Sequence, residues 1–143
     1  MQVIKNNQLI ENNWTFLEDD APVVAGNICV SFARWNAEKA DLSKHAGNLG
    51  VRLSTTDDIT SLGADLGLFA LVELNVLDFA DGRSFSQAYL LRNRYGFQGE
   101  IRAVGKYLAD QAFYFSRVGV NGFSPENLEK MQMTLHDFSV FYQ

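Results

Sequence analysis

Between residues 70 and 126, apolar positions switch between two spacings along the chain. Short apolar runs with strand composition are separated by longer segments whose apolar residues recur at helical spacing. Strands that alternate with helices of about 12 residues are typical of βαβ units, so we expect a parallel sheet with right-handed crossovers. The strands are expected at 70–76, 100–105 and 120–123, and the helices at 84–95 and 106–118, with a further helix beginning at Ser124, Pro125 and Glu126.

The first half of the chain has weaker patterns. Residues 3–10 (VIKNNQLI) are typical of a β-hairpin that turns at Asn6-Asn7, because asparagine tolerates the positive φ of tight turns. Beyond the hairpin we expect a loop at 11–22, strands at 27–32 and 50–53, a short helix at 41–47, and a weak helix capped by Thr55 or Thr56.

These elements place the protein in the α/β class. A single domain over residues 1–143 accounts for a chain of this length. Its alternating βαβ units would form a small, mostly parallel sheet, preceded by the N-terminal β-hairpin. Two architectures fit this pattern, an open three-layer sandwich and a half (β/α)-barrel, and the sequence does not separate them.

Composition and charge exclude several classes of protein. The net charge is −5, which argues against nucleic-acid binding, and no apolar run approaches the roughly 18 residues that span a membrane. The N-terminus is too polar for a signal peptide, so a cytoplasmic location is expected. Cys29 is the single cysteine, and His45 and His136 stand far apart, so neither a disulfide nor a helical metal pair is available. We therefore expect neither a cofactor nor a metal.

A local reversal of charge provides the main functional clue. Between residues 83 and 106 the chain carries five basic residues and one acid, Glu100. The loops that follow the strands of a parallel sheet gather at one edge, where ligand sites form, and helix N-termini at that edge favour an anion. The residues expected near this edge are Asp78, Asp81, Arg83, Lys106 and Ser124, and Arg92 and Arg102 complete the candidate site.

Two interpretations of these charges stay open. The basic residues either bind a small anion or neutralise internal carboxylates in a structural ion-pair network. The carboxylates available for such a network are Asp78, Asp81, Glu73 and Glu100.

Helical spacing distinguishes the arginines of the first predicted helix. Arg92 lies on its apolar stripe, whereas Arg94 lies on the opposite face beside Gln87. A buried guanidinium requires a carboxylate, such as Asp81 or Asp78, or a bound anion. Arg92 is therefore expected inside the protein and Arg94 in solvent.

On the second predicted helix, Tyr107, Ala112 and Phe115 share one apolar face with the amide of Gln111. Phe113 falls off this face and is a candidate for an interface. Cys29 lies in an apolar run, so we expect a core residue rather than a reactive thiol.

Several short motifs resemble a known bacterial family. They are DGR at 81–83, LLR-x-R-x-G at 90–96, GE-x-RAVG at 99–105 and DQ at 110–111, and the chain closes with DFSVFYQ. In this order they are similar to the family known as domain of unknown function 934, densely over 77–123 and more loosely over 1–70. Members are labelled as oxidoreductases involved in sulfite reduction. The resemblance implies an accessory role in assimilatory sulfite reduction, with a sulfite reductase component as partner.

Two positions differ from this family's pattern. Lys106 stands where relatives have an acid, and Val118 stands where they have a cysteine. If the acid or the thiol performs chemistry in relatives, this chain lacks it, which favours a binding role.

Three hypotheses follow, and the sequence does not decide whether the protein is an enzyme. In the first, it is a binding or interaction protein that contacts a reductase component or holds a small oxyanion. In the second, it is a small enzyme acting on an oxyanion, with Asp81 or Asp78 as acid or base and the arginines as electrophiles. In the third, it is a structural homodimer whose aromatic C-terminal tail or Phe113 face forms the interface.

Overall fold

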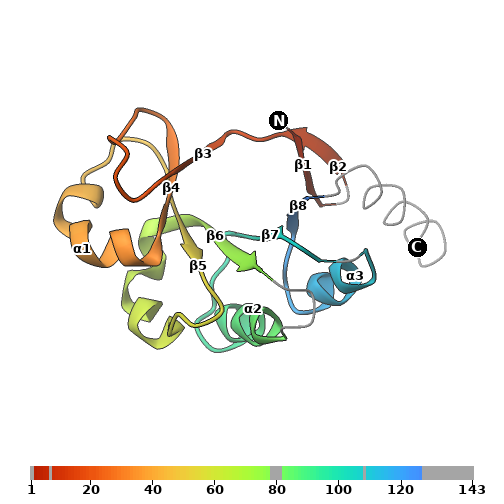
Figure 1. Cartoon of the computed structure of the whole chain (residues 1–143). Helices are drawn as coiled ribbons and strands as arrows, with labels where there is room; N and C mark the ends of the chain where they lie inside the picture. The colour runs from red at the N-terminus through yellow and green to blue at the C-terminus, as the bar shows by residue number, and fades with distance from the viewer. Residues whose placement is uncertain (1, 7, 78–81, 108, 127–143) are drawn as a thin grey trace.

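The strands form one curled sheet with the helices on its outer face. The computed structural model describes residues 2–6, 8–77, 82–107 and 109–126. Within them, eight strands pair in the order β2-β1-β8-β7-β6-β5-β4-β3, and four helices lie along one side of the sheet (Figure 1). The strands are β1 (Gln2–Lys5), β2 (Gln8–Glu11), β3 (Trp14–Leu17), β4 (Asn27–Ser31), β5 (Leu49–Leu53), β6 (Phe69–Val76), β7 (Glu100–Gly105) and β8 (Gly122–Pro125). The helices are α1 (Phe32–Leu42), the 3-10 helix η1 (Ile59–Leu68), α2 (Arg83–Asn93) and α3 (Ala109–Arg117).

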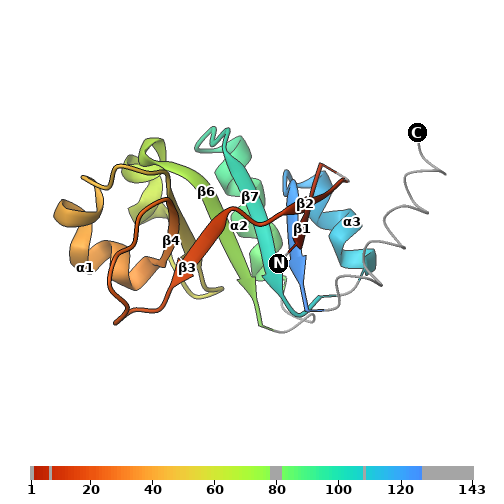
Figure 2. The same ribbon diagram turned by 90° about the horizontal axis from the view of Figure 1, so that it is seen from above.

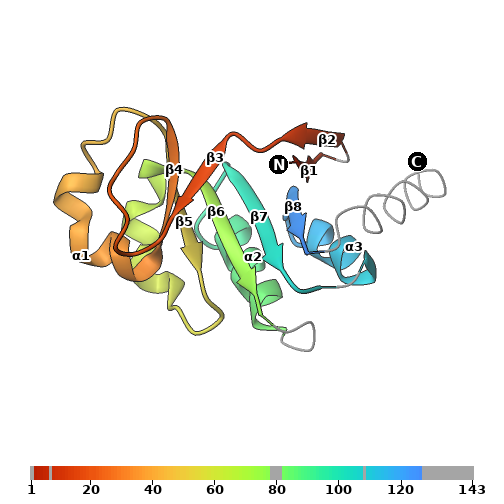
Figure 3. The ribbon, with the colours of Figure 1, turned by 45° about the horizontal axis from the view of Figure 1, so that its top comes forward.

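The strands from β3 to β8 run parallel, and their order in the sheet follows their order in the chain. From β4 onward, a helix connects each strand to the next, and these helices pack on the same face, as Figure 3 shows. This arrangement is a half (β/α)-barrel. Of the two predicted architectures, the half-barrel is confirmed, and the three-layer sandwich is wrong because it would require helices on both faces.

A two-residue link explains why the sheet curls. Strands β2 and β3 are its two edges, yet only Asn12 and Asn13 join them. Such a link spans at most about 11 Å, so the two edges must approach each other. The link passes across the inner face of β7 (Figure 2), where Asn12 Oδ1 accepts a hydrogen bond from Arg102 Nη1 at 3.0 Å. The inner face of the half-barrel is therefore partly covered by the chain's own backbone.

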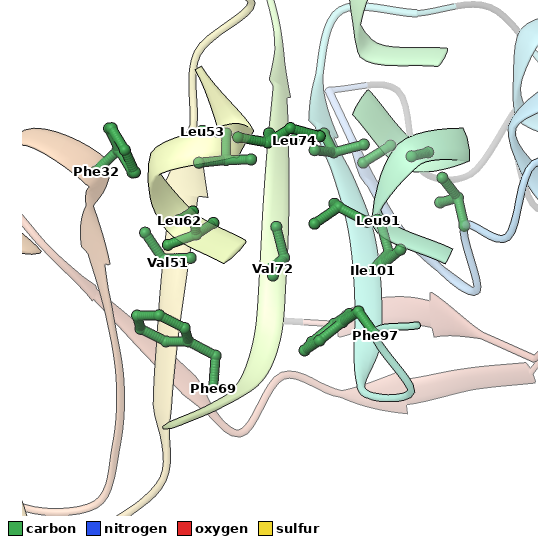
Figure 4. Close-up of a cluster of buried hydrophobic side chains, with 14 of the residues drawn as sticks. Phe32, Val51, Leu53, Leu62, Phe69, Val72, Leu74, Leu91, Phe97 and Ile101 are labelled. Carbon is green, nitrogen blue, oxygen red and sulfur yellow. The ribbon is translucent and has the colours of Figure 1, made fainter. Parts of the chain in front are cut away.

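The hydrophobic core lies between the outer face of the sheet and the helices. Val72 and Leu74 of β6 and Ile101 of β7 are fully buried, and they pack with Leu62 of η1 and Leu91 of α2 (Figure 4). Burying one side chain of this size stabilises the fold by about 1.5–3 kcal/mol. Because side chains alternate along a strand, the intervening residues of β6 and β7 point to the inner face.

The elements predicted from residue 70 onward are largely confirmed. The segments 70–76 and 100–105 are β6 and β7, and 84–95 corresponds to α2. The N-terminal hairpin is also confirmed, with Asn6 at a φ of 51° in its turn. Hydrophobic periodicity therefore predicted the regular strands and helices, and the Asn6-Asn7 pair predicted the turn of the hairpin.

Three predictions in the first half are wrong. The supposed loop 11–22 contains β3, a short edge strand that pairs with β4. The helix placed at 41–47 overlaps α1 only at residues 41–42, because α1 begins at Phe32 and ends at Leu42. Glu38 interrupts α1 with a φ of −127°. The helix expected after Thr55 or Thr56 is the 3-10 helix η1, which Asp58 caps by accepting from the Thr60 amide at 2.9 Å.

At the C-terminal end, Ser124 and Pro125 belong to β8 and do not begin a helix. The rest of that predicted helix and the aromatic tail fall in 127–143, outside the described residues.

Candidate functional site

Charged side chains form a row across the inner face of the half-barrel. Arg52 of β5 is in register with Glu73 of β6, which is in register with Arg102 of β7. Arg52 Nε donates to Glu73 Oε1 at 2.9 Å, and Arg102 Nε donates to Glu100 Oε2 at 2.6 Å. Glu73, Glu100 and Arg102 are buried. We call Arg52, Glu73, Glu100 and Arg102 the inner ion row.

At the β7 end of the inner ion row, the negative charge of Glu100 is neutralised by two cations. Glu100 is held between Arg102 and Lys5, whose Nζ lies 3.4 Å from Glu100 Oε1. Buried carboxylates and guanidinium groups of this kind need partners. Arg52 and Glu73 pair across neighbouring strands, whereas Arg102 and Glu100 pair within β7. With Lys5, the group holds three cations and two carboxylates. An ion-pair network, one of the two predicted interpretations, therefore accounts for Arg102.

A pocket of about 610 Å³ opens at the C-terminal ends of β3, β4, β5 and β6. Its inner wall includes Phe16, Ser31, Arg52, Ser54 and Asn75. This is the end of a (β/α)-barrel where ligand sites form, because the βα loops gather there. We call this space the C-terminal pocket.

Arg52 is fixed in the C-terminal pocket by two contacts. Its Nε is bound to Glu73, and its Cζ lies 3.6 Å from the centroid of the Phe16 ring. A cation held against an aromatic face in this way keeps a defined orientation. The side chain is 26% exposed, so part of the guanidinium faces the pocket.

Carboxylates surround the mouth of the same pocket, and the N-terminus of α1 lies beside them. Ser31 caps α1 by accepting from the Arg34 amide at 3.1 Å, and its hydroxyl donates to Asp19 Oδ1 at 2.5 Å. Asp57 Oδ2 accepts from the Ser54 amide at 2.8 Å. The remaining acidic residues of the mouth, Glu18 and Asp20, are exposed. The pocket thus combines a cationic inner wall with an anionic mouth.

A second pocket of about 530 Å³ lies at the opposite, N-terminal ends of the strands. Its wall includes Glu100 and Arg102 together with Trp14 and several amide side chains. The inner ion row therefore separates two openings of the half-barrel, and Arg52 faces the C-terminal one.

Cys29 lies beside this row and is fully buried. Its Sγ donates to Glu73 Oε1 at 3.3 Å. Burial, and then the charge of Glu73, raise the pKa of the thiol well above its ordinary value. The prediction that Cys29 is a core residue is confirmed, and the neutral thiol is poorly suited to nucleophilic chemistry.

Arg92 is half-buried as predicted, and within the described residues backbone oxygens hold its guanidinium. Its guanidinium donates to backbone carbonyls, namely to Gly119 at 3.0 and 2.8 Å, to Phe97 at 2.7 Å and to Gly99 at 2.7 Å. Burial lowers the pKa of Arg92 from its ordinary value. These carbonyl groups accept from Nε, Nη1 and Nη2, so backbone oxygens account for most of the donors of this guanidinium.

Arg83 and Lys106 lie at the C-terminal end of the half-barrel and are exposed. Arg83 is the first residue of α2, and Lys106 follows β7 directly, with its backbone amide donating to the Val76 carbonyl at 2.8 Å. Gly82 provides the N-cap position of α2 without a side-chain hydrogen bond. We call Arg83 and Lys106 the basic edge.

Two of the predicted site residues cannot be placed. Asp78 and Asp81 lie outside the described residues. Their predicted roles therefore stay predictions. These roles are the acid or base of an enzyme and the carboxylate that pairs with Arg92. Ser124 is half-buried within β8, in register with Val104.

The helices differ from their predicted faces in two places. Arg94 is exposed as predicted, but Gln87 is buried and donates to the Ser54 carbonyl at 2.8 Å, because α2 also packs against the loop after β5. In α3, Phe113 is half-buried near Arg117, and Tyr114 is the exposed aromatic.

Sequence reasoning missed the residues of the C-terminal pocket. Arg52 stands between apolar residues in the middle of a strand, where a charged side chain is unusual. Its partner Glu73 stands in a similar place and was named only as a carboxylate of the ion-pair network. That position was a usable signal of an inner polar face. Phe16 and Asp19 could not be found, because their segment was taken for a loop.

Comparison with protein families gives one match, to the model described as a bacterial protein of unknown function (DUF934), over residues 50–143. The chain belongs to the DUF934 family. Comparison with curated proteins and with solved structures yields no match. The DUF934 match contains Arg52 and the rest of the inner ion row, and residues 1–49 lie outside it.

Neither a membrane-spanning helix nor a metal-binding cluster occurs in the described residues of this DUF934 protein. None of the helices there is long and apolar enough to cross a membrane. The same part of the chain contains no cluster of three or more His, Cys, Asp or Glu side chains that would suit a metal ion.

Proposed function

We propose that this DUF934 protein is a cytoplasmic accessory protein of sulfite reduction that binds a small oxyanion at its basic edge. In this role it would also contact a sulfite reductase component. The pathway is what the resemblance of the motifs implies, and the exposure of Arg83 and Lys106 at one end of the half-barrel supports the binding role.

The distribution of the basic residues favours this edge over the other candidates. Arg92 is engaged by carbonyl groups, and Arg102 is engaged by Glu100. Arg94 is exposed at the other end of α2. Arg83 and Lys106 are exposed at the end where βα loops gather, which is where ligands bind in parallel α/β folds.

The start of α2 adds to the attraction for an anion. The first turn of a helix has backbone N–H groups without intrahelical acceptors, and the helix dipole is positive there. Because Gly82 provides no side-chain oxygen to cap these groups, an oxyanion would be a suitable acceptor. Arg83 begins the same turn, so its charge reinforces the dipole.

Thermal unfolding in the presence of sulfite, sulfate, phosphate and adenylyl sulfate tests this proposal. A ligand that binds the folded state raises the Tm, and we expect this shift in the wild-type protein and in Arg94→Ala, the matched control. Lys106→Ala should lose most of the shift while its Tm without ligand stays close to that of the wild type.

The absence of a shift with all of these anions at millimolar concentration would contradict oxyanion binding. A shift that survives in Lys106→Ala and Arg83→Ala would place the anion elsewhere, with Arg52 the next residue to test. Copurification with a tagged sulfite reductase tests the proposed contact independently. If this protein is not enriched, the proposal that a sulfite reductase component is its partner is contradicted.

A further inference from the structure

We propose that the C-terminal pocket binds a small zwitterion with a carboxylate and an ammonium group, the chemistry of a free amino acid. This ligand and this pocket are separate from the oxyanion and the basic edge. The inference depends on how positive and negative groups are distributed within one cavity.

The inner wall of the pocket favours the carboxylate. Within the described residues, Arg52 uses its Nε for Glu73 and one face for Phe16, while Nη1 and Nη2 have no hydrogen bond to the protein. A guanidinium has five donors in a planar fork that matches a carboxylate. The pocket side of Arg52 can therefore bind one.

The N-terminus of α1 lies at the same wall. Phe32 and Ala33, the first residues of this 11-residue helix, line the pocket, and Ser31 is its N-cap. The positive end of the helix dipole adds to the charge of Arg52 and again favours an anionic group. Two features from different elements thus point to the same end of a ligand.

The mouth of the pocket favours the ammonium group. Glu18, Asp19, Asp20 and Asp57 line it, and they come from the loops after β3 and β5. An ammonium group provides three donors for such oxygens. A dianion would be repelled by these four carboxylates, and a polyamine would be repelled by Arg52 and the helix dipole, so a molecule with both charges fits best.

The size of the pocket agrees with this ligand. About 610 Å³ is within the ordinary range of small-molecule sites, and it leaves room for a side chain beyond the two charged groups. Ser54 and Asn75 supply uncharged hydrogen-bonding groups along the wall. An amino acid with a polar side chain would use them.

Isothermal titration calorimetry with the standard free amino acids tests the inference on the full chain. We expect at least one of them to bind, and its N-acetyl and methyl ester derivatives, which each lack one charge, to bind at least about tenfold more weakly. If no amino acid produces a binding heat at millimolar concentration, or if both derivatives bind as well as the parent, the proposal is wrong.

Variants locate the site. Asp20→Asn removes one exposed mouth carboxylate, and Arg52→Lys keeps the positive charge but loses the planar fork. Each should weaken amino-acid binding about tenfold. The matched control is Asp110→Asn, an exposed acid on α3, which should bind as the wild type does.

If binding is unchanged in both Asp20→Asn and Arg52→Lys, the ligand lies outside this pocket and the proposal is overturned. Lys106→Ala separates the two sites, because it should lose the oxyanion response and keep amino-acid binding. The zwitterion site and the proposed function can therefore fail independently.

Discussion

Two arginines inside the fold are held by different kinds of oxygen. Arg102 is bound to the Glu100 carboxylate and the Asn12 amide, whereas Arg92 is bound to three backbone carbonyl groups. Helical periodicity showed that Arg92 faces inward, since periodicity depends only on spacing. It could not show the acceptors, because every residue has a carbonyl and only the fold decides which ones converge.

Replacing Arg92 tests the structural importance of these carbonyl contacts. Arg92→Met should lower the free energy of unfolding by about 2–4 kcal/mol, because it leaves the oxygens of Phe97, Gly99 and Gly119 without this donor. Urea unfolding at neutral pH provides the measurement. Arg94→Met, on the exposed end of the same helix, should stay within about 0.5 kcal/mol of the wild type. Similar losses for the two variants would contradict the structural role.

At the scale of elements, the C-terminal ends of β6, β7 and β8 meet at Gly105. This residue has a φ of 107°, the Lys106 amide donates to Val76 O, and the Glu126 amide donates to Gly105 O at 3.0 Å. The strands and helices of this region could be predicted, because apolar runs in the sequence alternate with segments of helical spacing. β3 and the start of α1 were missed because one is a short edge strand and the other is interrupted at Glu38.

A side chain at Gly105 should disturb this junction. In Gly105→Ala the new Cβ would collide with the carbonyl oxygen of Val76, and alanine disfavours the positive φ. We expect a loss of roughly 2–4 kcal/mol in the free energy of unfolding. Gly67→Ala is the matched control, because nothing lies within 4 Å of its added Cβ, and it should change stability by less than about 1 kcal/mol. Equal losses in denaturant melts of the two variants would refute this account of the junction.

At the scale of the whole molecule, the decisive feature is the short link between the two edges of the sheet. Asn12 and Asn13 bring β2 and β3 together, which curls the sheet and encloses an inner polar face. The sequence predicted a parallel sheet but not its closure, because the strand after the link was taken for a loop. In the sequence, the charged residues of β5, β6 and β7 stand singly among apolar residues. Nothing in this pattern shows that they lie side by side on neighbouring strands.

Two buried side chains lead to a prediction about stability at alkaline pH. Cys29 and Tyr107 are both buried, and burial is the first cause that raises the pKa of each well above its ordinary value. The opposing charges of Arg52 and Arg102 near Cys29 are outweighed by desolvation and by Glu73. In the unfolded chain a cysteine releases its proton near pH 8.5 and a tyrosine near pH 10, whereas the folded protein retains both protons.

The unfolded state therefore binds fewer protons than the native state above about pH 8.5, and the free energy of unfolding must fall as pH rises. Each such group contributes up to about 1.4 kcal/mol per pH unit. Urea unfolding of Cys29→Ala between pH 7 and 9.5 should lack the decrease that the wild type shows above pH 8.5. Tyr107→Phe should follow the wild-type slope in this range, because tyrosine contributes only near pH 10 and above. If Cys29→Ala and the wild type lose stability equally from pH 8.5 to 9.5, the thiol does not stay protonated beside Glu73.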